Sequence, residues 1–226
     1  MLKKCKTLET FIVFKVSSCI FIILFMKEDI VKKSEELFLS LGFKNITMDD
    51  IASAMGISKK TIYAHFCNKT ELVETVTFSV LDYIHQNIEQ INLKAVNPIE
   101  ELYDIKMFVM HYLRKERGSA QFQLKKYYPK IFEQLELKKF KKMHSSVEKS
   151  LTKGIELNLF RSDIDVAFIS RVYLIGMSGI RDTNVFPENK FDKSYLMESY
   201  LEYHLRAIVT DKGLKVLNKY TQNNKP

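Results

Sequence analysis

The chain has 226 residues, of which 46% are hydrophobic and 27% charged, and its formal net charge is +8 at pH 7. This length can bury the core of one large domain or of two modest ones, and the basic balance favours a polyanionic partner. With 7 glycines and 4 prolines in the whole chain, and long stretches patterned at helical period, the sequence favours an all-α fold class over a sheet protein.

The N-terminus carries an apolar run over residues 11–25, FIVFKVSSCIFIILF, which is preceded by Lys3, Lys4 and Lys6. The run is shorter than the ~20 residues of a spanning helix, contains Lys15 and lacks the small-residue cleavage site of a signal peptide. We therefore interpret residues 1–25 as an extension outside the native protein, with Met26 as the start, because exposed apolar tails promote aggregation. The alternative is a membrane segment.

A first amphipathic helix is predicted from Lys27 to Leu41. Its apolar stripe consists of Ile30, Val31, Ser34, Leu37, Phe38 and Leu41.

Residues 47–66, TMDDIASAMGISKKTIYAHF, predict two short helices joined by a tight turn. Thr47 is a candidate N-cap, with Asp50 three residues later as a short-armed capping box. Gly56 follows the apolar run, where a left-handed residue ends a helix without steric cost. Ser58 then caps a second helix, from Ser58 to about His65. This is the layout of a DNA-reading helix-turn-helix.

The second helix predicts a basic, hydroxyl-rich surface. Its apolar residues Ile62 and Phe66 lie four apart, so the other side chains are left for solvent. These are Lys59, Lys60, Thr61, Tyr63 and His65. Asn68, with Glu71 three residues later, caps a long helix that begins the rest of the chain.

The stretch from about Ile30 to Leu72 resembles the N-terminal DNA-binding domain of the tetracycline-repressor (TetR/AcrR) family of bacterial transcriptional regulators. The motifs that carry the resemblance are Leu41-Gly42-Phe43, Thr47 to Ala52, Gly56-Ile57-Ser58, and Thr61 to Phe66 with Lys69 and Leu72 behind. They cover about a fifth of the chain. Outside them, the chain is similar to the family in length, helical content and position.

The resemblance implies an all-helical homodimer that binds double-stranded, palindromic operator DNA and releases it when a small-molecule effector occupies the C-terminal domain. By family position, the second helix meets base edges with its first residues, and the aromatic, the histidine and the following lysine touch phosphates. The expected DNA contacts are Thr47, Ser58, Lys59, Lys60, Thr61, Tyr63, His65 and Lys69.

The expected organisation is an N-terminal three-helix domain with the helix-turn-helix over residues 26–72, and a larger helical ligand-binding and dimerisation domain over residues 73–214. A polar tail over residues 215–226 is expected to follow. In the second domain, Asn97-Pro98 marks a break before a new helix, and Pro129 is a kink or a helix start. Ser162 or Asp163 is expected to cap a helix that reaches Gly179, and a last long helix is predicted from about Asp192 to Val209.

The last helices of the second domain are the candidates for dimerisation, because they combine apolar and aromatic surface with a small residue. The predicted interface is Phe168, Tyr173, Ile175, Gly176, Leu196, Tyr200 and Tyr203. Core packing is the competing interpretation of the same residues. A pocket for an apolar or aromatic effector is predicted from thioethers and aromatics. Its candidate lining is Tyr103, Met107, Met110, His111, Phe122, Tyr127, Tyr173 and Met177.

Other chemistry is not indicated. The 3 cysteines lack CxxC spacing, so neither a disulfide framework nor a zinc site is predicted, and a reducing cytoplasm is favoured. No cofactor or enzymatic motif is present: the chain has no phosphate loop, dinucleotide fingerprint or nucleophile elbow. The lysine-rich residues 125–142 are interpreted as amphipathic helices with solvated lysines, and a second nucleic-acid surface is the alternative. Two further alternatives are a helical protein-interaction adaptor and a membrane-tethered regulator that uses residues 11–25.

Overall fold

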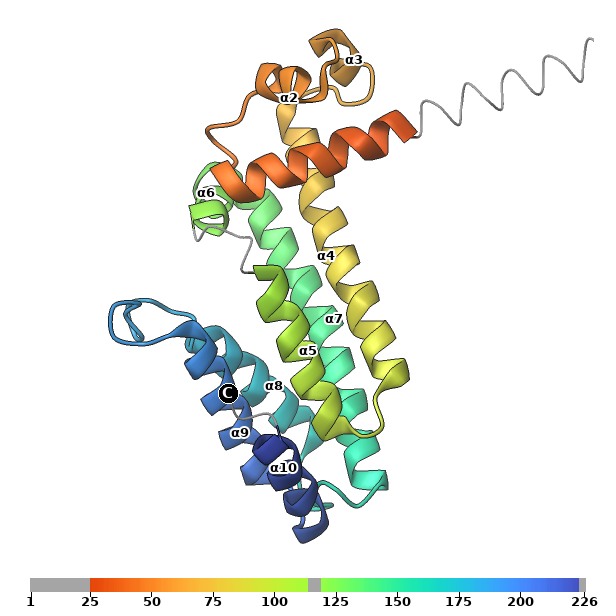
Figure 1. The fold of residues 1–226 in the computed structure, drawn as a ribbon, viewed down its shortest axis with the longest axis vertical. Helices are drawn as coiled ribbons and strands as arrows, with labels where there is room; N and C mark the ends of the chain where they lie inside the picture. Colours follow the sequence, from red (N-terminus) through yellow and green to blue (C-terminus); the bar gives the residue numbers. More distant parts are fainter. Residues whose placement is uncertain (1–24, 114–118, 224–226) are drawn as a thin grey trace, which may run out of the picture. The chain divides into compact units, whose positions relative to one another are not determined.

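The computed structural model describes residues 25–113 and 119–223, and in these ranges the secondary structure is helical apart from one isolated β-bridge between Phe160 and Val209 (Figure 1). The predicted all-α class is therefore confirmed. A first helix covers residues 25–41. The labelled helices are α2 (Met48–Met55), α3 (Lys59–Tyr63), α4 (Lys69–Lys94), α5 (Pro98–Leu113), α6 (Ser119–Tyr127), α7 (Pro129–Glu156), α8 (Val166–Gly179), α9 (Lys193–Ile208) and α10 (Asp211–Asn223).

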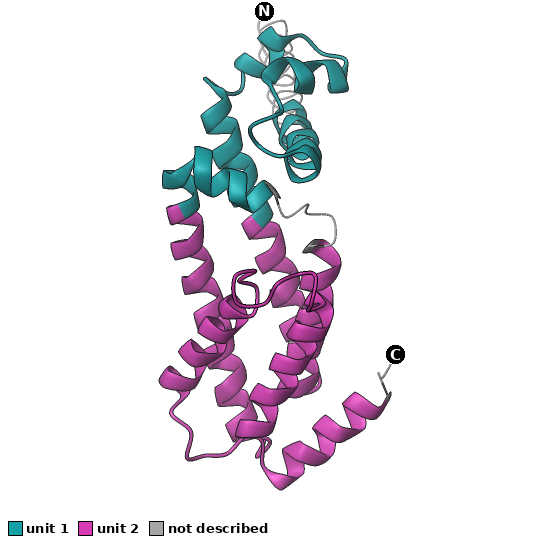
Figure 2. Cartoon of the chain, turned by 90° about the vertical axis from the view of Figure 1, so that its left-hand side faces the viewer, with its two compact units in different colours: residues 1–80, 116–132 teal, residues 81–115, 133–226 magenta. Residues whose placement is uncertain are grey.

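The chain divides into two compact units, coloured separately in Figure 2. Unit 1 contains residues 1–80 and 116–132, and unit 2 contains residues 81–115 and 133–226. Helix α6 thus packs with the N-terminal helices, although the sequence places it among the segments expected in the second domain. Helices α4 and α7 each contribute residues to both units.

The core of unit 1 joins the first helix to α2, α3 and α4. Ile30, Phe38, Ile51 and Ile62 are fully buried, and Phe66 is almost so. Each of these side chains contributes about 1.5–3 kcal/mol by leaving water, which fixes the short helices against one another.

Gly42 ends the first helix in the left-handed region, at φ +88°, and its amide donates to the carbonyl of Phe38 at 2.9 Å. A Cβ at this position would meet the side chain of Gln123 at about 2.4 Å, so glycine is required both by the backbone and by the approach of α6. The Gln123 Oε1 accepts a hydrogen bond from the Lys44 amide at 2.8 Å. Helix α6 is thereby held against the loop that leads into α2.

The core of unit 2 is formed by α5, α7, α8, α9 and α10. Ile99, Tyr103, Leu151, Leu201 and Leu205 are each at most 1% exposed. The predicted start of α5 at Pro98 is confirmed, and Asn97 accepts from the amides of Ile99 and Glu100. Pro129 is a helix start and not a kink, since it opens α7.

The start of α8 differs from the expectation. Asp165 caps it, with its carboxylate accepting from the Phe168 amide at 3.0 Å, whereas Ser162 and Asp163 lie in the preceding turn. Asp192 caps α9 in the same way, through the Tyr195 amide. Three residues that commonly cap helices, Ser162, Asp163 and Asp165, occur within four positions, so the local sequence does not choose between them. Packing of Val166 against the core places the helix start directly after Asp165.

The C-terminal segment also differs from the expected polar tail, because α10 continues to Asn223. Leu217 is fully buried, and the ring of Tyr220 stacks on Tyr103 with 4.5 Å between centroids. These residues lie three apart on one helical face, a short stripe that the surrounding lysines and asparagines hide in the sequence. Gly213 allows the start of α10 to lie close to the backbone at Leu159, since a Cβ on Gly213 would meet the Leu159 carbonyl oxygen at about 2.1 Å.

Candidate nucleic-acid interface

Helix α2 begins with a complete capping box. The Asp50 amide donates to Thr47 Oγ1 at 3.2 Å, and Asp50 Oδ2 accepts from the Thr47 amide at 2.8 Å and from its hydroxyl at 2.7 Å. The hydrogen bonds from Thr47 hold the pKa of Asp50 below its usual value. The predicted cap is thus confirmed, and the Thr47 hydroxyl is already engaged within the protein.

The turn between α2 and α3 is set by Gly56, which adopts φ +65° and donates from its amide to the α2 carbonyls. The Ile57 amide closes the turn on the Ala52 carbonyl at 3.0 Å. Ser58 then caps α3, with its hydroxyl accepting from the Thr61 amide at 3.1 Å. The tight turn and the second cap are as predicted from the sequence.

Helix α3 is shorter than the predicted Ser58-to-His65 segment, because it ends at Tyr63. The His65 amide bonds back to the Ile62 carbonyl, three residues earlier, so the last turn tightens before the chain turns toward α4. Ile62 is buried beneath the helix, whereas Lys60 is exposed and Tyr63 is 44% exposed. The polar side of α3 therefore faces solvent, as a DNA-reading helix requires. Thr61 and His65 are half-buried at its edges.

Lys59 is paired across the turn with Asp49, a residue that the sequence analysis did not single out. Its Nζ lies 2.6 Å from Asp49 Oδ2, and both side chains are exposed. The hydrogen bond to Asp49 raises the pKa of Lys59. In the sequence, the pair is marked only by an aspartate in the first turn of α2 and a lysine ten residues later. That pattern is too common to predict an ion pair.

Lys69 stabilises the fold, in addition to standing where the family resemblance implies a phosphate contact. Its ammonium donates to the carbonyl of Phe43 at 2.6 Å and lies 5.9 Å from the centroid of the Phe38 ring. Desolvation lowers its pKa, although the nearby Asp50 acts in the opposite direction. Lys69 thus ties the start of α4 to the end of the first helix and its following loop.

A helix-turn-helix with these caps matches a known family. Residues 30–76 match the family model described as bacterial regulatory proteins, tetR family. Over a much longer span, the chain is 26% identical over 200 residues to the HTH-type transcriptional repressor KstR2 of Mycolicibacterium smegmatis, covering 84% of this chain and 93% of that protein. Residues 30–76 form a DNA-binding domain of the TetR type.

Further comparisons agree with this assignment. The chain is 32% identical over 78 residues to the biofilm operon regulator IcaR of Staphylococcus aureus, which is 34% of this chain and 42% of IcaR. Its fold is similar to that of a transcriptional regulator from Cytophaga hutchinsonii, with a TM-score of 0.68 and 19% identity over 81% of this chain and 98% of the other. A TetR-family regulator from Agrobacterium tumefaciens gives a TM-score of 0.65 at 14% identity, with 83% and 100% covered.

The effector-pocket residues predicted from the sequence fall in both compact units. Phe122 and Tyr127 belong to unit 1, and the others belong to unit 2. Tyr103 and Tyr173 are 1% and 7% exposed in the core of unit 2, whereas Met107 is 59% exposed. His111 is exposed, and Met110 and Met177 are half-buried.

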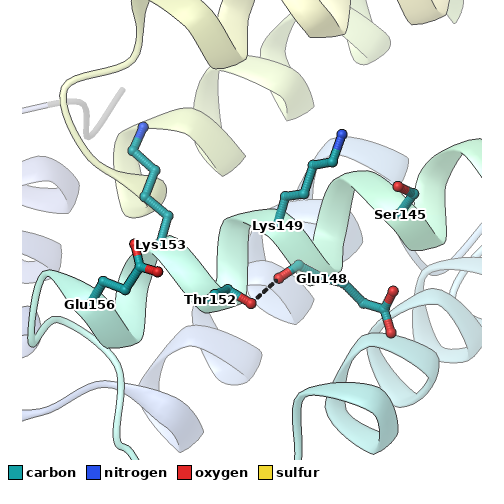
Figure 3. Close-up of a pocket in the computed structure, with 6 residues that line it drawn as sticks. All are labelled: Ser145, Glu148, Lys149, Thr152, Lys153 and Glu156. Carbon is teal, nitrogen blue, oxygen red and sulfur yellow. Dashed lines mark hydrogen bonds between the residues drawn. The ribbon is translucent and has the colours of Figure 1, made fainter.

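The depressions found on the described surface are of another kind. The first runs along one face of α7 and is lined by Ser145, Glu148, Lys149, Thr152, Lys153 and Glu156 (Figure 3). All six side chains come from a single helix, so they cannot enclose a ligand. The second lies on α4 between Gln86 and Gln90 and has the same character.

The predicted dimerisation residues of α8 and α9 separate into two groups. Phe168, Ile175 and Tyr203 are 62%, 68% and 73% exposed, whereas Tyr173 and Leu196 are buried within the chain. The sequence analysis missed two exposed apolar neighbours, Val172 on α8 and Tyr195 on α9. Helical period gives the signal: Val172 follows Phe168 by four residues, and Tyr195 precedes Tyr203 by eight.

Gly176 and Tyr200 of the predicted interface instead contact each other within the chain. The Tyr200 hydroxyl donates to the carbonyls of Val172 and Tyr173, at 3.1 and 3.2 Å, in the space beside the glycine. These residues therefore set the packing of α8 against α9.

His144 lies between a carboxylate and a hydroxyl. Its Nδ1 is 3.4 Å from Glu148 and its Nε2 is 3.2 Å from Ser170 Oγ. The order Ser170, His144 and Glu148 resembles a nucleophile, a base and an orienting acid. However, Ser170 is fully buried, so a substrate does not reach its oxygen. The contact joins α7 to α8.

The described residues offer neither a metal site nor a membrane-spanning helix. No group of three or more His, Cys, Asp or Glu in that part of the chain is placed to hold a metal ion. None of the helices described there combines the length and apolar character that crossing a bilayer demands. The predicted extension and its membrane alternative over residues 11–25 lie outside the described residues, apart from Phe25.

Proposed function

We propose that this protein is a TetR-family transcriptional repressor that binds a palindromic operator as a homodimer and releases it when a small molecule occupies unit 2. The observation that carries the proposal is the solvent-facing polar side of α3, presented by two consecutive capped helices and a left-handed glycine. Repression as the output is supported by the names of the relatives, since KstR2 and IcaR are both named as repressors or negative regulators.

In this proposal α3 lies in the major groove, with Lys59, Lys60 and Thr61 near base edges. Lys60 is exposed beside Tyr63 and is available for this role without rearrangement. Lys59 first has to leave Asp49, whose carboxylate is repelled by the phosphates. DNA contact by Lys59 therefore costs an ion pair, which makes its contribution smaller than that of Lys60.

Phosphate contacts are proposed for Thr47, Ser58, Tyr63, His65 and Lys69. Tyr63 is the simplest case, because its ring is 44% exposed next to the helix end. Lys69 is proposed to keep its hydrogen bond to the Phe43 carbonyl and to donate a remaining N–H to a phosphate. The Thr47 hydroxyl has one proton, which it donates to Asp50, so Thr47 is proposed to release Asp50 when it donates to a phosphate.

Dimerisation is proposed through the outward face of α8 and α9. Five apolar side chains of these two helices are 40% to 73% exposed in the single chain, and association removes such surface from water. They are Phe168, Val172, Ile175, Tyr195 and Tyr203. The two α3 helices of one dimer then contact two half-sites of the operator. These half-sites are separated by about one helical turn of DNA, ~34 to 36 Å, or by a related spacing.

The effector is proposed to be an apolar or aromatic molecule, because the helices of unit 2 are rich in tyrosine, phenylalanine and methionine. We place its site between helices of unit 2, since the depressions on α4 and α7 are each lined by a single helix and cannot enclose a ligand. Release of DNA requires that the effector bind the released state better than the operator-bound state.

The test is selection of bound fragments from host genomic DNA by the full-length protein, followed by fluorescence anisotropy on the selected duplex. The proposal predicts a common palindromic sequence and weaker binding to a scrambled duplex of the same length. A helical adaptor without DNA contacts would show no salt-dependent binding to any duplex, because phosphate contacts always weaken with added salt. Compounds that are made or processed by the proteins encoded in the neighbouring genes are then the first candidate effectors to add.

A further inference from the structure

Two lysines of the lysine-rich residues 125–142 form ion pairs within unit 2. In unit 2, Lys139 pairs with Glu136, and Lys142 Nζ lies 2.7 Å from Asp82 Oδ1. In unit 1, by contrast, Lys125, Lys126 and Lys130 are exposed, and no described carboxylate forms an ion pair with them. Helix α6 itself contains no acidic residue. Within the described residues, the basic charge at this end of the run therefore has no carboxylate partner.

Lys44 joins these lysines in space. Its Nζ lies 5.0 Å from the centroid of the Tyr127 ring, and the Nζ of Lys126 lies 5.5 Å from the same ring. Lys126 is also 5.7 Å from the centroid of Phe122. Two cations are thus gathered over one exposed aromatic ring, whose negative face offsets part of their mutual repulsion.

The backbone beneath this surface is fixed. Gln123 accepts from the Lys44 amide at 2.8 Å, and its side chain fills the space beside Gly42 where a Cβ would stand. Phe43 contacts Tyr128 edge to face, with 6.4 Å between centroids. The four lysines are therefore presented by one packed structure within unit 1, and are not scattered on independent segments.

The chemistry of this surface favours phosphates. The exposed rings of Phe122 and Tyr127 are partly covered by ammonium groups, so the surface offers charge and no apolar groove. Lys44 precedes Thr47 by three residues, which limits their separation to about 10 Å. A duplex presents one negative charge per ~1.7 Å of its axis, so DNA seated on α2 and α3 carries further phosphates within reach of such neighbours.

We propose that Lys44, Lys125, Lys126 and Lys130 form a second phosphate-binding surface of unit 1, which contacts the backbone of the operator duplex outside the bases read by α3. This inference rests on the proposed DNA-binding function. The surface adds affinity without base preference, because phosphates carry no sequence information.

The test compares full-length wild type with a K125Q/K126Q/K130Q variant on the selected operator duplex, by anisotropy over a series of salt concentrations. Lys44 is left in place so that the variant and its control each lose three lysines. Loss of three phosphate contacts lowers the slope of log K against log salt by about 2.7, with the same relative preference for mutated operators. A K125R/K126R/K130R variant keeps the charge and is expected to keep the wild-type slope.

The matched control is K139Q/K141Q/K142Q, which removes the same charge from α7 in unit 2 and is expected to leave the slope within about one unit of wild type. An unchanged slope in the K125Q/K126Q/K130Q variant, or an equal change in the control, would overturn the inference by showing no local contact. If wild type itself fails to prefer the operator over scrambled DNA, the proposed function fails instead. The two failures are therefore distinguishable.

Discussion

The hydroxyl of Tyr200 on α9 lies about 2.0 Å from where a Cβ on Gly176 of α8 would stand. The same hydroxyl donates to the Val172 and Tyr173 carbonyls, so the glycine and the tyrosine together hold the two helices in close contact. The outward apolar face proposed for dimerisation is built on this pair. Its geometry depends on a residue with no side chain.

Gly176→Ala is expected to destabilise the protein by about 1–3 kcal/mol, because the added methyl displaces Tyr200 from its hydrogen bonds. Urea denaturation monitored by circular dichroism measures the change. Gly179→Ala, in the same helix, is the matched control, since a Cβ there meets nothing within 4 Å. Equal midpoints for the two variants would show that the contact does not constrain the packing.

Lys69→Met is expected to reduce stability by about 1–2 kcal/mol as well as DNA affinity, because it removes the charged hydrogen bond to the Phe43 carbonyl. Tyr63→Ala is expected to reduce DNA affinity with stability unchanged within about 0.5 kcal/mol, since Tyr63 is an exposed surface residue. Thermal melts and anisotropy on the same samples separate the two effects. A Lys69→Met protein that melts like wild type would contradict the structural role.

Asp49→Asn is expected to strengthen binding to every duplex, because it frees Lys59 and removes a carboxylate that faces phosphates. One added phosphate contact by the freed Lys59 steepens the slope of log K against log salt by about 0.9. The salt series of the variant is compared with that of Lys59→Gln/Asp49→Asn, where the gain from Lys59 is absent. Identical slopes for both proteins would show that the pair does not restrain Lys59.

His204 is expected to make unfolding depend on pH, because burial lowers its pKa from 6.5 to about 4. Its ring lies 4.7 Å from that of Tyr173 in the core of unit 2. Between pH 6.5 and 4 the unfolded state binds the proton and the folded state does not, so stability falls as pH falls through this window, by about 3 kcal/mol in total. His204→Leu removes this contribution. Denaturation series for both proteins at pH 7.5 and 4.5 check it, and an equal loss in the variant would exclude His204 as the cause.

The DNA-binding end of the chain was predictable because its signals are local. Thr47, Gly56 and Ser58 each act on residues within four positions, and the structure has them in the predicted roles. Phe66 and Ile62 likewise follow from helical spacing. Family resemblance added the DNA-facing assignment to this local pattern.

Features that depend on distant residues were not predictable in the same way. Gln123 lies against Gly42 and Lys44, some eighty positions earlier, and no local pattern marks that contact. Tyr173 and Leu196 are aromatic and apolar, as interface residues often are, yet packing within the chain buries them. Periodicity shows that a helix has an apolar face, but not what covers that face.

The most direct test of the central claim is the affinity of full-length wild type, Tyr63→Ala and Lys60→Ala for the selected operator and for single-base variants of it, at one fixed salt concentration. We expect Tyr63→Ala to weaken binding to all duplexes by a similar factor, and Lys60→Ala to change the ranking among them. A double variant that binds every duplex with wild-type affinity would contradict the assignment of α3 as the DNA-reading helix.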